Sequence, residues 1–146
     1  MDTRIRDGFA RQRFMSLLGA SMGHVAPGEA EITLPITADL TQHTGVVHAG
    51  AITSIADSAC AAAAATYLSE GQAVVSVEFK VNLLAPATGD SLRAIGRVVR
   101  AGRTITVCTG EVWALTGTQS RMVAVMQATM MAVTNRDTNV PEISAR

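Results

Sequence analysis

The side chain best suited to chemistry in this sequence is a single carboxylate. Asp57 is the only Asp, Glu, Lys or Arg between Ala49 and Ser69, a run made mainly of alanine and other small or apolar residues. A helix of this composition is expected to be buried, and a charge inside it is costly unless something compensates it. An ionised carboxylate with few competing partners is a group that acid–base or nucleophilic catalysis can use. The structural alternative is an Asp bonded to Thr53 or Ser54, one helical turn earlier, that serves solubility or dimer register.

A polar loop leads into this helix and supplies a second candidate group. His48, Ala49 and Gly50 stand at the expected helix start. If the helix begins near them, the N–H groups of Ala49 and Gly50 have no acceptor within the helix and point out of its N-terminus. Together with the helix dipole, such donors stabilise negative charge that develops on a substrate oxygen. An ordinary helix start, with Gly50 present for turn geometry, is the alternative.

These residues form a motif that resembles a known signature. The run Gly45-Val46-Val47-His48-Ala49-Gly50, with Asp57 seven residues after Gly50, is similar to the motif of hotdog-fold acyl-CoA thioesterases, most closely those of the phenylacetate-degradation (PaaI-like) type. The similarity covers most of the chain, and its less specific parts are Leu18-Gly19, Pro27-Gly28-Glu29, Val77-Glu78-Phe79 with Asn82 and Pro86, and Arg100-Ala101-Gly102-Arg103. The resemblance implies an enzyme that hydrolyses acyl-CoA thioesters without a metal or a redox cofactor, coenzyme A being part of the substrate.

The resemblance also implies roles for single residues. Asp57 attacks the thioester carbonyl, or activates a water for that attack, across a dimer interface, while the N–H groups of Ala49 and Gly50 polarise the carbonyl. Gln42 falls where an Asn or Gln side chain contacts the thioester or the attacking water. His48 is expected to hold the loop by hydrogen bonds rather than to transfer protons. The family usually has Gly where this chain has Ala49, and the added methyl group restricts φ and alters the shape offered to the acyl group.

Ser76 matches a position at which some relatives use a hydroxyl group to orient the water. Alternation along residues 72–84 places Ser76 on one face with Glu78 and Lys80, opposite an apolar row that includes Val75 and Phe79. On this pattern Ser76 reaches the chemistry only if its strand lies at the dimer seam. A solvated strand serine is the alternative.

Basic residues gather where a strand, a turn and a second strand are predicted. Arg97, Arg100 and Arg103 belong to this cluster, and Lys80 is expected nearby. Arginine side chains suit the phosphate groups of coenzyme A, so these four residues are candidates for substrate binding. A solvated hairpin tip explains the same residues.

Metal and thiol chemistry are not indicated. His43, His48 and Asp57 are of metal-binding types, but they lack a recognisable ligand spacing, so we expect no metal site. Cys60 falls in the apolar helix and Cys108 in a strand pattern. Both are predicted to be small buried thiols rather than parts of a disulfide framework.

Hydrophobic periodicity predicts the elements that must position these groups. It indicates a short helix over 3–18, strands over 20–25 and 29–36, a long helix over 49–68, and a meander of strands over 72–84, 91–100, 104–115 and 121–133. We therefore expect one α+β domain over 1–146, in which an antiparallel sheet wraps around one long central helix, with a poorly ordered tail at 135–146. The hotdog fold follows from the resemblance. Such a sheet leaves an edge and an outer face uncovered, so a homodimer formed by edge pairing, or a homotetramer, is expected.

The composition narrows the setting in which the protein works. Its 12 basic and 12 acidic residues cancel, which argues against nucleic acid or an anionic membrane as partner. The N-terminus has no apolar core of signal-peptide type, so a cytoplasmic location is expected. Two other functions remain open: a hotdog enoyl-CoA hydratase, which usually pairs a catalytic His with Asp or Glu in another motif, and a non-catalytic module that binds acyl-CoA. The second leaves Asp57 unexplained.

Overall fold

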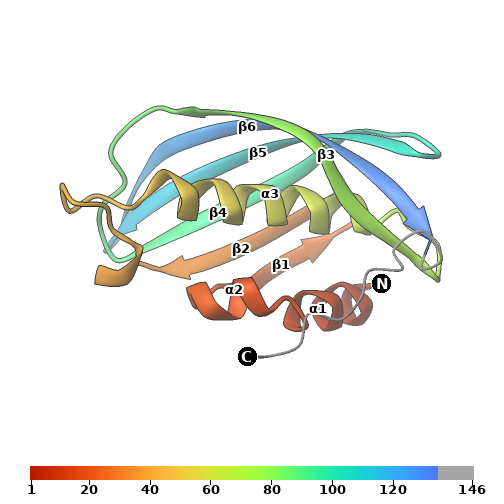
Figure 1. Cartoon of the computed structure of the whole chain (residues 1–146), viewed down its shortest axis with the longest axis horizontal. Coiled ribbons are helices and arrows are strands. Elements are labelled where there is room, and N and C mark those ends of the chain that lie inside the picture. Colours follow the sequence, from red (N-terminus) through yellow and green to blue (C-terminus); the bar gives the residue numbers. More distant parts are fainter. Residues whose placement is uncertain (135–146) are drawn as a thin grey trace.

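The computed structural model describes residues 1–134, in which one long helix lies against a six-stranded antiparallel sheet (Figure 1). The elements in chain order are α1 (Asp2–Ala10), α2 (Arg13–Leu18), β1 (Ser21–Ala26), β2 (Glu29–Pro35), a 3-10 helix (Ala38–Leu40), α3 (Ala49–Ala65), β3 (Gln72–Leu83), β4 (Ser91–Ala101), β5 (Ile105–Thr116) and β6 (Gln119–Thr134). This arrangement confirms the expected α+β hotdog architecture. The tail at 135–146, for which disorder was expected, lies outside the described residues. No helix in the described part has the length and apolarity needed to cross a membrane.

The strands are arranged in the order β1-β2-β4-β5-β6-β3. Their predicted bounds agree with the structure to within two or three residues, but the prediction that the last four form a simple meander is wrong. Only β4, β5 and β6 do so, whereas β3 pairs with β6 at the far side and β4 pairs with β2. The reason is that α3, which follows β2 and precedes β3 in the chain, crosses the face of the sheet and brings the chain to its far side. As a result β1 and β3 form the two edges.

The N-terminal segment is two helices rather than the single one predicted. α1 buries Ile5 and Phe9, and α2 buries Met15, while Phe14 and Leu17 are exposed. In one continuous helix Met15 would point about 120° away from Phe9, since six residues turn through about 600°. The break between the helices lets both side chains reach the core.

Small residues allow α3 to lie very close to the sheet. Ala56, Ala59 and Cys60, on the side of α3 that faces the strands, are fully buried. Opposite them, Gly96 of β4 has no side chain, and a Cβ atom added there would overlap the backbone of Ala59 and Cys60. Gly110 of β5 lies against the Cys60 sulfur in the same way. The helix therefore meets β4 backbone to backbone.

Replacing Gly96 by Ala is expected to lower the free energy of unfolding by about 1–3 kcal/mol, because the new methyl group forces α3 away from β4. Urea unfolding followed by circular dichroism measures this change. The control is Gly8→Ala in α1, where an added Cβ meets no atom within 4 Å. That variant should be at least as stable as the wild type, since Ala favours a helix over Gly by about 0.5–1 kcal/mol. Equal stability of Gly96→Ala and the wild type would contradict the close contact.

Candidate active site

Asp57 lies half-buried in the middle of α3, and one hydroxyl group is bonded to it. Ser76 Oγ donates a hydrogen bond to Asp57 Oδ1 over 2.7 Å. Ser54 instead donates to the carbonyl oxygen of Gly50 over 2.6 Å, so the alternative partner one helical turn earlier is turned away. Within residues 1–134 no ion pair involves Asp57. The carboxylate is therefore held by a neutral donor and has no competing cation.

A β-bulge places Ser76 on the helix-facing side of β3. Ser76 pairs with Met130, but the next paired residue is Glu78, opposite Thr129, so Val77 is the extra residue of the bulge. An extra residue reverses the alternation of side chains, and the expectation that Ser76 shares a face with Glu78 and Lys80 is wrong. Ser76 thus reaches Asp57 of its own chain. Met130, whose sulfur lies 3.5 Å from Ser76 Oγ, was not singled out in the sequence, because only the pairing of β3 with β6 brings it here.

The start of α3 is capped by His48. The Nδ1 atom of His48 accepts a hydrogen bond from the N–H of Gly50 over 2.8 Å. The backbone N–H of His48 donates to the carbonyl of Leu40 over 2.8 Å, and these two bonds tie the loop to the helix start. The N–H of Gly50 is thus engaged, whereas the N–H of Ala49 donates to no acceptor in the described residues.

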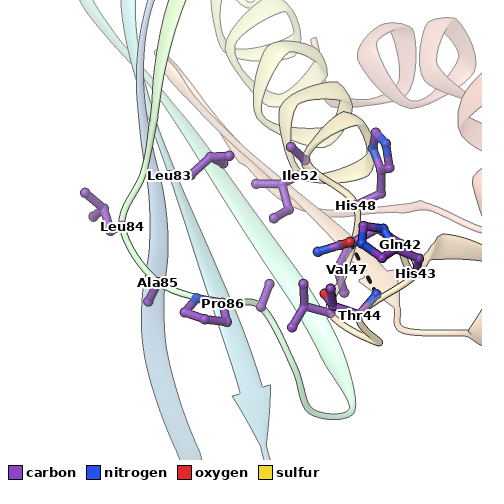
Figure 2. Close-up of a pocket in the computed structure, with 13 residues that line it drawn as sticks. Gln42, His43, Thr44, Val47, His48, Ile52, Leu83, Leu84, Ala85 and Pro86 are labelled. Carbon is purple, nitrogen blue, oxygen red and sulfur yellow. Dashed lines mark hydrogen bonds between the residues drawn. The ribbon is translucent and has the colours of Figure 1, made fainter.

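A cavity of about 890 Å³ adjoins this helix start (Figure 2). Residues Gln42 to Ala49 form one wall, and Leu83 at the end of β3 forms the other together with the segment after it, which includes Leu84 and Pro86. Gln42 Oε1 accepts a hydrogen bond from the N–H of Thr44 over 3.3 Å, which the dashed line in Figure 2 marks. The volume falls within the range of about 300–1,000 Å³ that is usual for small-molecule sites.

Asp57 and the helix start do not meet within one chain. Asp57 comes eight residues after Ala49, which places it about 12 Å further along the helix at a rise of about 1.5 Å per residue. Asp57 and Ser76 are accordingly absent from the residues that line the cavity at the helix start. A single carbonyl group cannot contact both the Asp57 carboxylate and the Ala49 N–H of the same chain, because reacting groups must approach within about 3 Å.

The four basic candidates separate into two kinds. Arg97 is paired with acidic side chains: its Nε lies 2.9 Å from Glu29 Oε2, and its Nη1 lies 3.5 Å from Glu111 Oε2. Arg100, Arg103 and Lys80 are exposed, and no ion pair within residues 1–134 involves them. Of the four candidates, these three offer a positive charge that no ion pair within residues 1–134 engages.

The two cysteines are free and buried, as the sequence predicts. Burial raises the pKa of the Cys108 thiol to about 11. Burial also raises the pKa of Cys60 far above its ordinary value, with smaller contributions from Cys108 and Asp57. Neither thiol is suited to act as a nucleophile, since the thiolate is the reactive form. Among residues 1–134 no group of three or more His, Cys, Asp and Glu side chains gathers into a metal-binding cluster.

Comparison with known proteins gives a consistent picture. Residues 44–120 match the model of the Thioesterase superfamily. A solved thioesterase family protein from Silicibacter pomeroyi is 42% identical, with 92% of this chain and 98% of that chain covered and a TM-score of 0.89. The PaaI protein of the E. coli phenylacetic acid degradation operon shares the fold at 24% identity, covering 87% of this chain and 88% of its own, with a TM-score of 0.78. A candidate esterase of Halobacterium salinarum is 35% identical over 98 residues, a segment that spans 64% of each chain.

The buried thiols predict how stability depends on pH. A thiol whose pKa is raised on folding contributes stability that is complete below its unfolded pKa and is lost as the pH rises through the folded one. For Cys108 this window runs from 9.0 to about 11. Urea unfolding between pH 8 and pH 11 should show a steeper loss of stability for the wild type than for the Cys60→Ala, Cys108→Ala double variant. Identical slopes would show that the thiols ionise equally well in the folded chain.

Proposed function

Because the chain belongs to the thioesterase superfamily and is a thioester hydrolase, we propose that it hydrolyses acyl-CoA thioesters at a site organised by Asp57. The observation that carries this proposal is the 2.7 Å hydrogen bond from Ser76 to Asp57. It fixes the direction of a half-buried carboxylate without neutralising its charge, so that Oδ2 remains available to react. The cavity at the helix start adds room for the substrate.

Asp57 can serve in either of two ways. As a nucleophile, it attacks the thioester carbon, the coenzyme A thiolate leaves, and water then hydrolyses the mixed anhydride. As a general base, it takes a proton from a water that attacks the same carbon, and the proton passes to the departing thiolate. In both routes negative charge develops on the carbonyl oxygen. The unpaired N–H of Ala49 suits that oxygen, whereas the N–H of Gly50 is engaged by His48 Nδ1 and would join it only if that hydrogen bond were released.

The proposed site is completed by a second copy of the chain. The Ala49 N–H and Asp57 are too far apart to act together within one chain, so each carbonyl would be held between Asp57 of one subunit and the helix start of its partner. The edge strand β3 supports this arrangement, because Val75, Val77 and Phe79 are exposed on it. A long apolar edge that stays uncovered invites pairing with another strand. Pairing of two β3 edges gives a twofold symmetric dimer.

The remaining candidates are proposed to contact other parts of the substrate. For Gln42, which lies in the cavity wall, we propose contact with the thioester or the water. Arg100, Arg103 and Lys80 provide positive charge for phosphate groups. We assign Arg97 a supporting role, because Glu29 and Glu111 already occupy its guanidinium.

Hydration of an enoyl-CoA is disfavoured, since within residues 1–134 no histidine is hydrogen-bonded to Asp57.

Thiol release from acetyl-, hexanoyl-, lauroyl-, benzoyl- and phenylacetyl-CoA tests the reaction. Asp57→Asn is expected to lower kcat/KM at least about 100-fold, because the amide is neither nucleophile nor base. Ser76→Ala should lower it about 10-fold through loss of one orienting hydrogen bond, worth about 1.4 kcal/mol. Ser58→Ala, which removes another half-buried hydroxyl group from α3, is the control and should leave the rate unchanged. No thiol release by the wild type would overturn the proposal, and full activity of Asp57→Asn would remove Asp57 from it.

A mixing experiment tests whether the site spans two subunits. Ala49→Pro removes the proposed N–H donor, and the fold tolerates it because Pro is favoured at the first helical position and His48 before it is already extended, at φ −61 and ψ 136. We expect this variant to lose about 100- to 1,000-fold in kcat while melting like the wild type. Refolding it with an equal amount of Asp57→Asn should restore about one quarter of wild-type activity. Half of the dimers are then mixed, and each mixed dimer has one intact site of two. A mixture as inactive as its components would place the whole site in one chain.

A further inference from the structure

A second cavity, of about 250 Å³, lies under α1 and one helical turn beyond Asp57. Its floor is formed by three alanines of α3, namely Ala61, Ala62 and Ala65, and α1 supplies Ile5, Gly8 and Phe9 on the opposite side. Figure 1 shows α1 lying along the β1 side of the sheet, where it covers this part of the molecule. The exposed residues Arg11 and Gln12 also line the cavity and mark its open side. Most of the lining is apolar.

The cavity lies on the same faces of α3 and β3 as Asp57 and Ser76, although neither of these two residues lines it. Ala61 follows Asp57 by four residues, so the two share one face of α3 and lie about 6 Å apart along its axis. Val74, which lines the cavity, precedes Ser76 by two residues on β3 and shares its helix-facing side. The carboxylate and the cavity thus lie on the same strip of both elements.

Two arginines hold α1 in place above the cavity. Arg4 donates hydrogen bonds of 2.9–3.0 Å to the carbonyl oxygens of Ala65, Leu68 and Ser69, at and beyond the C-terminal end of α3. Arg6 bonds to the backbone carbonyls of β1. Together these bonds fix α1 to α3 and β1 at once. The cavity is therefore formed before any ligand arrives. The Arg4 guanidinium is engaged with the three carbonyl oxygens and is not available to bind a ligand.

We infer that this cavity receives the distal part of the acyl group of the thioester, and that it selects apolar acyl chains long enough to reach it. This inference rests on the proposed hydrolysis of acyl-CoA. When the thioester carbon lies at Asp57, an acyl chain must run about 6 Å along α3 before it enters the cavity, so an acetyl group is too short to use it. A cavity of about 150 Å³ accommodates a benzene ring, which scales to about ten carbon atoms for this one. Those 6 Å take up about five bonds of an extended chain, so hexanoyl and phenylacetyl groups end at the entrance, whereas octanoyl and lauroyl groups place their distal carbon atoms inside the cavity.

The test compares kcat/KM across acetyl-, hexanoyl-, octanoyl-, lauroyl- and phenylacetyl-CoA. The wild type should prefer the octanoyl and lauroyl groups, which are long enough to enter the cavity. Ala61→Leu fills the cavity from α3, and Gly8→Leu fills it from α1, where the space beside the α-carbon is open. Both variants are expected to lose at least about 10-fold on octanoyl- and lauroyl-CoA, since the added side chain displaces the distal methylene groups from apolar surroundings, and to keep their activity on acetyl-CoA within about twofold. Ala10→Leu adds the same side chain to α1 at an exposed position outside the cavity and should leave the preference unchanged.

Two readouts separate this inference from the proposed reaction. Thermal stabilisation by octanoate and laurate reports occupation of the cavity without catalysis, and it should be present in Asp57→Asn but absent in Ala61→Leu. If the wild type released no thiol, this binding pattern would still support the cavity as an acyl site while the proposed reaction failed. A more stable Ala61→Leu with an unchanged acyl preference would show only a packing void. Loss of activity on every substrate to the same extent, acetyl-CoA included, would also overturn the inference.

Discussion

The close contact between α3 and the middle of the sheet is the constraint on which the other features depend. Because Gly96 has no side chain, β4 packs directly against the backbone of Ala59 and Cys60. The helix can therefore neither rotate nor slide without a clash. Asp57 lies two residues before Ala59, so the packing sets where its side chain leaves the helix, and the hydrogen bond from Ser76 then fixes the direction of its carboxylate. The same packing sets where Ala61 and Ala65 point, since they follow on the same helix face. A catalytic group on a rigid element needs less support from its neighbours than one on a loop.

The edge strand β3 then has to supply what the helix cannot. A regular strand would alternate without interruption and turn Ser76 away from α3, as the sequence pattern suggests. The extra residue Val77 corrects this at one point: Ser76 faces Asp57, and beyond the bulge Phe79 pairs with the buried, helix-facing Ala128. Bulges often occur at sheet edges beside functional sites, where they redirect a single side chain. Here the bulge brings a hydroxyl group to a carboxylate that would otherwise lack a hydrogen-bond donor.

The parts that could be predicted from the sequence are those with a local cause. The alanine run that contains Asp57 indicates a buried helix, and the alternation in 29–36 or 104–115 indicates strands, because side-chain period and burial are written into neighbouring residues. Contacts between distant residues leave no such trace. The bulge at Val77 depends on register with β6, and the engagement of Arg97 depends on Glu29, which lies 68 residues away in the chain. The cavity under α1 likewise exists only where α1, α3 and β3 meet. The alanine run alone does not indicate whether its residues pack against other side chains or line a cavity.

The parts of the proposed site follow one another along α3. Its N-terminal end carries the amide donors and the larger cavity, and Asp57 lies about 12 Å further along, with the smaller cavity beyond it. If two copies pair with their helices antiparallel, the start of one helix comes to lie opposite Asp57 of the other. The coenzyme A arm then approaches through the partner's larger cavity, and the acyl group continues past Asp57 into the smaller cavity of its own subunit. One carbonyl group, between the two, faces the amides on one side and the carboxylate on the other. Twofold symmetry completes a second site by the same contact, so dimer formation and assembly of both sites are a single event.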